Sequence, residues 1–211
     1  MGPTQFDLFD SSANNILDAK DYPTFRKGLA ESNCTKCALS QGRTHIVVDR
    51  GNPQSKILLI GEGPGEQEDL QGRPFVGRAG KLLDELMKGA GFDTNTDMMI
   101  ANIVKCRPPE NRAPKQEEAE TCMPYLQKQI QLMKPKLMIL LGATSVKYLV
   151  PELTERSMGS MVGNFYNFPS WPGIKLLVVY HTAFILRDPR KRPLMEQHLR
   201  ALKAHLTTSP S

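Results

Sequence analysis

The sequence predicts an α/β fold of three layers, in which helices cover both faces of a central, mainly parallel, four-stranded sheet. Short apolar runs alternate along the chain with amphipathic helical patterns. The runs are apolar throughout, as is typical of strands that are buried on both faces. The 211 residues provide for one substantial core, so we expect one domain over residues 23–206. Residues 1–22 are expected to form a flexible leader and residues 207–211 a disordered tail.

The expected elements follow one another in regular order. The strands are the apolar runs Lys56–Ile60, Met98–Val104, Lys136–Leu141 and Lys175–Tyr180. Helices are expected over residues 79–90, 116–133, 143–150 and 193–206. Ligands of such sheets bind beyond the carboxyl ends of the strands. We therefore expect one pocket to be lined by the residues at those ends, which are Glu62–Gly65, Asn102, Gly142 and His181.

The glycine-rich segment Gly61–Gly65 follows the first expected strand but does not match a nucleotide-binding loop. The dinucleotide pattern requires glycine at position 66, where this chain has Glu66, and no Walker lysine follows. Pro64 lacks the amide that a phosphate would accept from, and the carboxylates of Glu62 and Glu68 would repel one. The loop therefore suits a neutral base better than a pyrophosphate.

The four cysteines comprise a close pair, Cys34 and Cys37, and two distant residues, Cys106 and Cys122. The sequence has no signal-peptide pattern and no apolar run of membrane-spanning length, so we expect a cytoplasmic protein with reduced thiols. Four thiolates in such a chain suit an iron–sulfur cluster or a tetrahedral zinc ion. The alternative is that each cysteine is a small apolar residue of the core. The net charge of +5 is compatible with a polyanionic partner but does not require one.

Four motifs, in order, resemble the family 4 uracil-DNA glycosylases, the iron–sulfur members of the uracil glycosylase superfamily. They are Gly61–Gly80, Ala101–Pro114, Ile139–Ser145 and His181–Pro189. The spacing of the cysteines adds to the resemblance, which covers about residues 34–206. The resemblance implies a monofunctional enzyme that excises uracil from single- and double-stranded DNA and starts base excision repair. It also implies a [4Fe-4S] cluster with ligands Cys34, Cys37, Cys106 and Cys122.

The resemblance assigns uracil-binding roles to specific positions of this chain. The residues that match the family's uracil-contacting loop are Glu62, Gly63 and Pro64. Phe75 matches the aromatic residue that stacks on the base, Asn102 the amide that reads its edge, and His181 the histidine near uracil O2. An aromatic face, an amide and a donor at O2 are what a flipped uracil needs.

The expected catalytic residues are a donor and a carboxylate. His181 is expected to donate to the negative charge that develops on O2. Glu62 or Glu68 is expected to stabilise the positive charge on the sugar and orient the water. Family 1 enzymes have an aspartate at the position of Gly63, so the residue that activates the water stays open.

A basic segment follows the histidine motif and is expected to bind DNA. Arg187, Arg190 and Lys191 are candidates for phosphate contacts, with a solvated surface run as the alternative. The wedge that fills the gap left by the flipped base is expected among Phe184, Ile185 and Leu186.

The chain departs from the family pattern at one position that bears on the reaction. Thr182 stands where the family commonly has proline, which frees a backbone amide beside the histidine. Residues 107–114 lack the histidine-bearing insertion of the branch that traps uracil DNA covalently, which favours turnover. The alternatives are a non-catalytic or uracil-trapping iron–sulfur damage sensor and a hydrolase of free nucleosides.

The leader contains a short motif that resembles the peptide that binds the bacterial sliding clamp. Gln5 is followed by Leu8 and Phe9, and these apolar side chains would fill a hydrophobic pocket on a partner. The alternatives are packing of the leader on its own domain and a chance match. We otherwise expect a monomer with DNA, in the nucleoid, as its principal partner.

Overall fold

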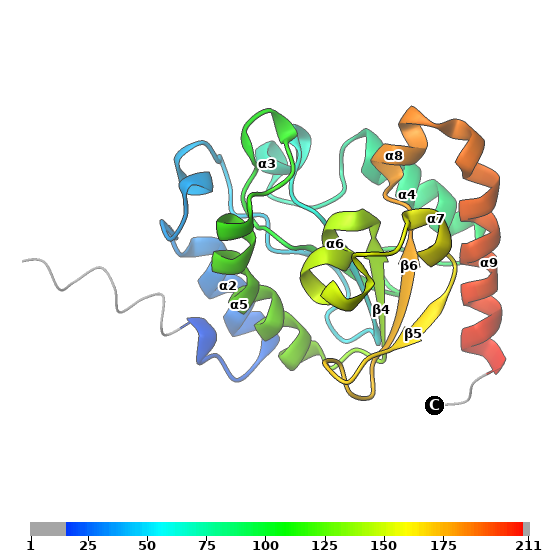
Figure 1. Ribbon diagram of the computed structural model, residues 1–211. Helices are drawn as coiled ribbons and strands as arrows, with labels where there is room; N and C mark the ends of the chain where they lie inside the picture. The colour runs from blue at the N-terminus through cyan, green and yellow to red at the C-terminus, as the bar shows by residue number, and fades with distance from the viewer. Residues whose placement is uncertain (1–15, 209–211) are drawn as a thin grey trace, which may run out of the picture.

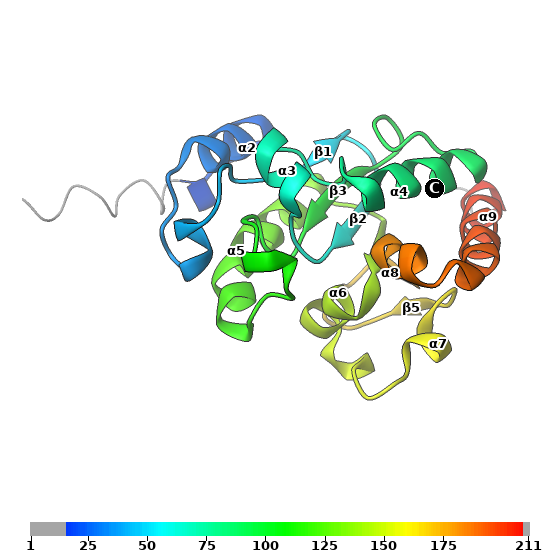
Figure 2. The same ribbon diagram turned by 90° about the horizontal axis from the view of Figure 1, so that it is seen from above.

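The computed structural model describes residues 16–208 and contains a six-stranded sheet between two layers of helices (Figures 1 and 2). The strands are β1 (Arg50–Gly51), β2 (Ile57–Gly61), β3 (Met99–Asn102), β4 (Leu137–Leu141), β5 (Phe165–Asn167) and β6 (Lys175–Val179). Their order in the sheet is β1-β3-β2-β4-β6-β5, and the pairs among β3, β2, β4 and β6 are parallel. The predicted α/β class and its parallel centre are confirmed.

The predicted number of four strands was wrong, because two short strands extend the sheet at its edges. β1 pairs with β3 and β5 pairs with β6, both antiparallel. β1 has two residues, and β5 has three that are half-buried or exposed. Strands this short, and exposed in the case of β5, carry no apolar run, so the pattern that revealed the central four could not reveal them.

Helices pack on both faces of the sheet. They are α2 (Tyr22–Glu31), α3 (Glu66–Gln71), α4 (Arg78–Gly89), α5 (Gln116–Met133), α6 (Gly142–Leu149), α7 (Met158–Met161), α8 (Thr182–Arg187) and α9 (Arg192–Thr208). In the view from above, α2 and α5 lie on one side of the sheet and α4 and α9 on the other (Figure 2). All four predicted helices are present, and the predicted bounds of α5 match the structure.

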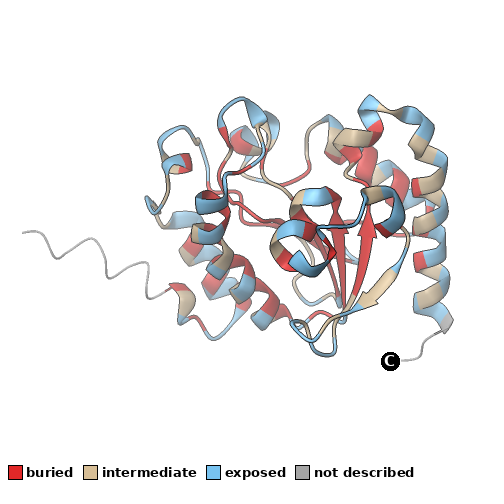
Figure 3. Cartoon of the chain, in the orientation of Figure 1, coloured by how far each residue is buried: buried red, intermediate tan, exposed pale blue. Residues whose placement is uncertain are grey.

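The core follows from the apolar strands. Every residue of β2, β3 and β4 is buried, which Figure 3 shows as the red centre of the molecule. The parallel register places Gly61 opposite Asn102 at the carboxyl ends of β2 and β3. The sheet therefore presents these two positions side by side at one edge.

Both ends of the domain differ from the expected boundaries. Ile16, Ala19 and Tyr22 are buried, and Tyr22 Oη donates to Asp49 Oδ2 at 2.9 Å. Within the described residues, the packed part of the chain therefore already includes Ile16, earlier than residue 23, while α9 continues through Thr208. The clamp-like motif at residues 5–9 lies outside the described residues. None of the helices in residues 16–208 is long and apolar enough to cross a membrane.

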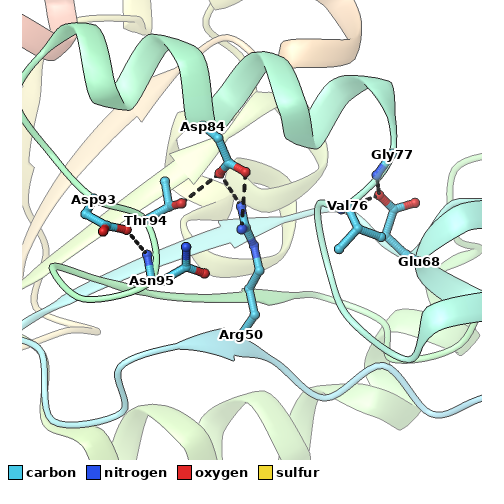
Figure 4. Close-up of polar contacts among 8 residues, drawn as sticks. All are labelled: Arg50, Glu68, Val76, Gly77, Asp84, Asp93, Thr94 and Asn95. Carbon is cyan, nitrogen blue, oxygen red and sulfur yellow. Dashed lines mark hydrogen bonds and ion pairs between the residues drawn. The ribbon is translucent and has the colours of Figure 1, made fainter.

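The edge strand β1 is tied to α4 by a buried cation (Figure 4). Arg50 is 5% exposed, and its guanidinium forms an ion pair with Asp84 of α4. Asp84 Oδ1 also accepts a hydrogen bond of 2.7 Å from the Thr94 hydroxyl. These contacts fix α4 against the sheet, and the amino end of α4 faces the hollow described next.

Candidate active site

Two adjoining hollows lie at the carboxyl ends of the parallel strands. Both are lined by Glu62, Asn111, His181 and Ala183. Gly63, Pro64, Phe75 and Leu186 line one of them, and Gly142, Thr144 and Arg187 line the other. Of the residues expected to converge there, Glu62–Gly65, Gly142 and His181 line these hollows, whereas Asn102 lines neither.

Asn102 presents a buried amide at the end of β3. The residue is 1% exposed, and neither Oδ1 nor Nδ2 has a hydrogen-bond partner within the described part of the chain. A Cβ added to Gly61 would lie 2.6 Å from Asn102 Oδ1 and 2.6 Å from the ring of Phe75, so glycine is needed there. Because an unpaired buried amide is costly, this arrangement indicates a ligand with a matching donor and acceptor.

Phe75 lies beside this amide in a strained backbone conformation. Its φ of 56° is in the left-handed region, which bulky residues rarely adopt. The ring centroid lies 5.7 Å from that of His181. A Cβ on Gly80 would lie 1.9 Å from the carbonyl oxygen of Phe75, so only glycine lets α4 pack this closely. The strain is therefore maintained by the packing around the loop and presents the ring to the site.

Glu68 holds the same loop from the other side. Its Oε1 accepts hydrogen bonds from the backbone amides of Val76 at 2.9 Å and Gly77 at 2.7 Å (Figure 4). Glu68 also lines the hollow. Since two amides engage this oxygen, the geometry gives Glu68 a clear part in fixing the loop that carries Phe75.

His181 is the N-cap of α8, and its ring is oriented by the backbone. The Ala183 amide, 3.1 Å away, donates to Nδ1, which places the proton of a neutral imidazole on Nε2. Burial is the main cause of a lowered pKa of His181. The positive charge of Arg187 also lowers this pKa, whereas the negative charge of Glu62 raises it. The imidazole is therefore neutral at neutral pH and has an N–H available to a ligand.

Glu62 and Asn111 complete the walls of the site. The Glu62 carboxylate accepts a short hydrogen bond from the hydroxyl of Thr144 in the first turn of α6. Asn111 has a left-handed backbone, with a φ of 56°, and its Oδ1 accepts from Arg107 Nε at 2.8 Å. Neither Thr144 nor Asn111 was predicted from the sequence as a site residue. A signal for Asn111 was available, since asparagine tolerates the left-handed region better than most residues.

A separate cavity brings the four cysteines together. Its lining includes Cys34, Cys37, Cys106 and Cys122, together with the cations Arg43 and Lys105. Arg43 Nη1 lies 3.5 Å from Cys106 Sγ. Burial raises the pKa of Cys37, that of Cys106 to about 11 and that of Cys122 to about 12. Within residues 16–208, no group of three or more histidine, cysteine or acidic side chains is arranged to hold a metal ion.

The composition of this cavity nevertheless fits an iron–sulfur cluster. It offers four soft ligands around one space, and cations adjacent to that space would offset the negative charge of thiolates. Without a bound metal, burial favours the neutral thiols, so the thiolate ligands require a positively charged partner.

Comparison with known proteins places this chain in a family. The model of the uracil DNA glycosylase superfamily matches residues 48–206. The type-4 uracil-DNA glycosylase of Saccharolobus solfataricus is 41% identical over 181 residues, which cover 84% of this chain and 83% of the relative. The chain belongs to the type-4 uracil-DNA glycosylase family. The type-4 enzyme of Thermotoga maritima is 42% identical over 74% of this chain and 79% of its own length. The type-5 uracil-DNA glycosylase of Thermus thermophilus is more distant, at 26% identity over 63% of this chain and 67% of the relative.

In this type-4 family member, the basic segment after His181 reaches the hollows only at its first residue. Arg187 lines one hollow, whereas Arg190 pairs with Asp188 at 2.7 Å and is 89% exposed. Among the three wedge candidates, Ile185 is buried and Phe184 packs on Tyr180 with ring centroids 5.1 Å apart. Leu186 is 38% exposed and lines the other hollow, and it is the most exposed of the three.

Proposed function

We propose that this protein hydrolyses the N-glycosidic bond of a flipped deoxyuridine in DNA, releasing uracil and leaving an abasic site that starts base excision repair. The observation that carries the proposal is the buried, unpaired amide of Asn102 beside the Phe75 ring and the His181 donor. Membership of the type-4 uracil-DNA glycosylase family supports it.

Base reading follows from the chemistry of the amide. Asn102 Nδ2 would donate to uracil O4, and Oδ1 would accept from N3–H. Cytosine presents an amino group and an unprotonated N3 at these places, so it would leave both buried atoms mismatched. The Phe75 ring would supply a stacking face for a base that has left the duplex.

Bond cleavage follows from two groups that both line the hollows. As the bond breaks, negative charge develops on uracil O2, and the Nε2–H of His181 would donate to it. We assign the Glu62 carboxylate, held by Thr144, to stabilise the positive sugar and orient the water. Glu68 would act mainly by holding the Phe75 loop.

A uracil-containing oligonucleotide, followed by alkali, tests this function. Strand breaks at the uracil position, from both single- and double-stranded substrate, are expected from the intact protein. Tight binding without breaks would instead identify a damage sensor, and release of uracil from free nucleosides would identify a nucleoside hydrolase. The same oligonucleotide with thymine is the control.

Replacing Asn102 with aspartate is expected to shift preference from uracil toward cytosine. A carboxylate accepts from the cytosine amino group but cannot donate to uracil O4. Asn102→Ala should lower uracil excision by about 100-fold or more, since it removes both contacts. The measurement is single-turnover excision from matched uracil and cytosine oligonucleotides, with the exposed Asn95→Asp as control. An unchanged ratio of the two rates in Asn102→Asp would remove Asn102 from base reading.

We propose that Cys34, Cys37, Cys106 and Cys122 hold a [4Fe-4S] cluster. Their common cavity and its cationic lining support this assignment. When bound, the cluster would supply a covalent cross-link between the segment after α2, the segment after β3, and α5. Its principal contribution would then be to stability and to the position of the loop that follows Cys106.

We further propose that Arg187, Arg190 and Lys191 contact phosphates while Leu186 fills the gap left by the flipped base. The position of Arg187 and Leu186 on the rim of the hollows supports this orientation of DNA. The proposed working form is a cytoplasmic monomer that acts on nucleoid DNA.

The sliding clamp is the proposed protein partner, bound through Gln5, Leu8 and Phe9. A synthetic peptide of residues 1–15 is expected to bind a bacterial clamp with micromolar affinity, about −8 kcal/mol. Fluorescence anisotropy of the labelled peptide is the measurement. A Leu8→Ala, Phe9→Ala peptide should not bind, and equal binding by the two peptides would exclude the motif as the contact.

A further inference from the structure

Lys105 is a fully buried cation next to the proposed base-reading residue. It is 1% exposed, and its Nζ donates to the backbone oxygen of Asn102 at 2.7 Å and to Gln129 Oε1 at 2.6 Å. A buried ammonium is costly unless acceptors surround it, so both contacts are needed to keep it there. The side chain of Lys105 thus binds the backbone of Asn102, the last residue of β3.

The acceptor on α5 is itself fixed by further buried contacts. Gln129 is 0% exposed, and its Nε2 donates to Tyr22 Oη at 2.9 Å and to the Val48 carbonyl at 3.2 Å. Tyr22 in turn donates to Asp49, which pairs with Arg26 at 3.0 Å. The ammonium is therefore held in a rigid frame that extends from the end of β3 through α5 to α2.

The position of the Asn102 amide depends on this frame. Within residues 16–208 its side-chain atoms make no hydrogen bond, so the direction of the amide is set by its backbone and by packing. The ladder from β2 reaches Asn102, and the Ile103 amide donates to the Gly61 carbonyl at 3.0 Å. Beyond this point the Asn102 carbonyl is fixed by Lys105.

We propose that Lys105 is a positioning residue that aims the Asn102 amide at the base and ties it to the four-cysteine site. Lys105 directly precedes Cys106 and lines the cysteine cavity. Its side chain therefore contacts both this cavity and the end of β3 at Asn102. The inference rests on the proposed function, because it assumes that Asn102 reads uracil.

The test compares Lys105→Met with Lys128→Met in the cluster-loaded protein. Methionine keeps the apolar stem of Lys105 but removes the donor. Lys128 is half-buried on α5, directly precedes Gln129 and is not among the residues that line the cysteine cavity. Lys105→Met is expected to weaken binding of free uracil, measured by calorimetry, and to slow single-turnover excision, each by roughly 10-fold. Lys128→Met should match the parent in both.

A double-mutant cycle separates positioning from general destabilisation. In an Asn102→Ala background, Lys105→Met should cause no further loss of excision rate, because the residue it positions is gone. Equal losses in both backgrounds, or no loss in the parent background, would overturn the inference. If Lys105→Met gives no folded protein, Gln129→Leu replaces it, with a smaller loss expected and the same dependence on Asn102. A parent protein that neither binds nor excises uracil would refute the proposed function itself, which is a separate outcome.

Discussion

Replacing His181 with alanine should slow uracil excision by about 100-fold or more while leaving the binding of abasic DNA nearly unchanged. The reason is that Nε2–H is the donor aimed at the charge that forms on uracil O2, and such a donor acts mainly in the transition state. Its orientation is fixed in advance, since Nδ1 accepts from the Ala183 amide at 3.1 Å. Single-turnover excision and abasic-DNA binding, measured side by side, check the prediction.

The pH dependence of the same reaction follows from the neutral imidazole. Burial lowers the pKa of His181 below its ordinary value of 6.5, so the neutral donor persists as the pH falls through 6.5. Activity should decline only as the pH falls through the lowered pKa, and His181→Ala should lack this acid limb. The same shift makes acidification through this window destabilising, because the unfolded chain binds the proton first.

A histidine outside the site provides the control for both experiments. His205→Ala on α9 should keep the parent rate and the parent pH profile. Excision by His181→Ala at the parent rate would remove His181 from the mechanism and leave the oxyanion to backbone amides of the loop after β2.

Replacing Cys122 with alanine should abolish most of the soluble, brown protein. Cys122 lies on α5, and loss of one ligand would release the cross-link between this helix and the segment that carries Cys34 and Cys37. The parent should contain about four iron and four sulfide per chain. Soluble yield, visible absorbance and iron content are the measurements, and the protein that does fold should keep its preference for uracil.

Thr121→Ala is the matched control for this substitution. Thr121 lines the same cavity, one residue from Cys122, but its hydroxyl donates to the Glu117 carbonyl within α5. The Thr121→Ala variant should therefore contain as much iron as the parent protein. A colourless, fully active parent with stoichiometric zinc would contradict the cluster and retain the four cysteines as zinc ligands.

From the amino-acid sequence alone one could predict the parallel centre of the sheet, the bounds of α5 and the family. Strands buried on both faces must be apolar throughout, so they can be recognised in the sequence as continuous apolar runs. The rule that ligands bind beyond the strand ends then indicated which residues would meet. It identified Glu62, Gly142 and His181 correctly as neighbours, although 80 and 39 residues separate them along the chain.

The contacts that each of these side chains makes could not be predicted in this way, because they depend on the folded chain. The tautomer of His181, the loop-holding contacts of Glu68 and the unpaired amide of Asn102 depend on distances between atoms of different elements. The frame around Lys105 joins residues up to 107 positions apart through hydrogen bonds of about 3 Å. A motif records which residue types stand near one another in sequence, whereas hydrogen bonding, burial and pKa are set by packing across the sheet. For this reason the hydrogen bond from Lys105 to the Asn102 carbonyl could not be predicted from the position of Lys105 beside Cys106 in the sequence.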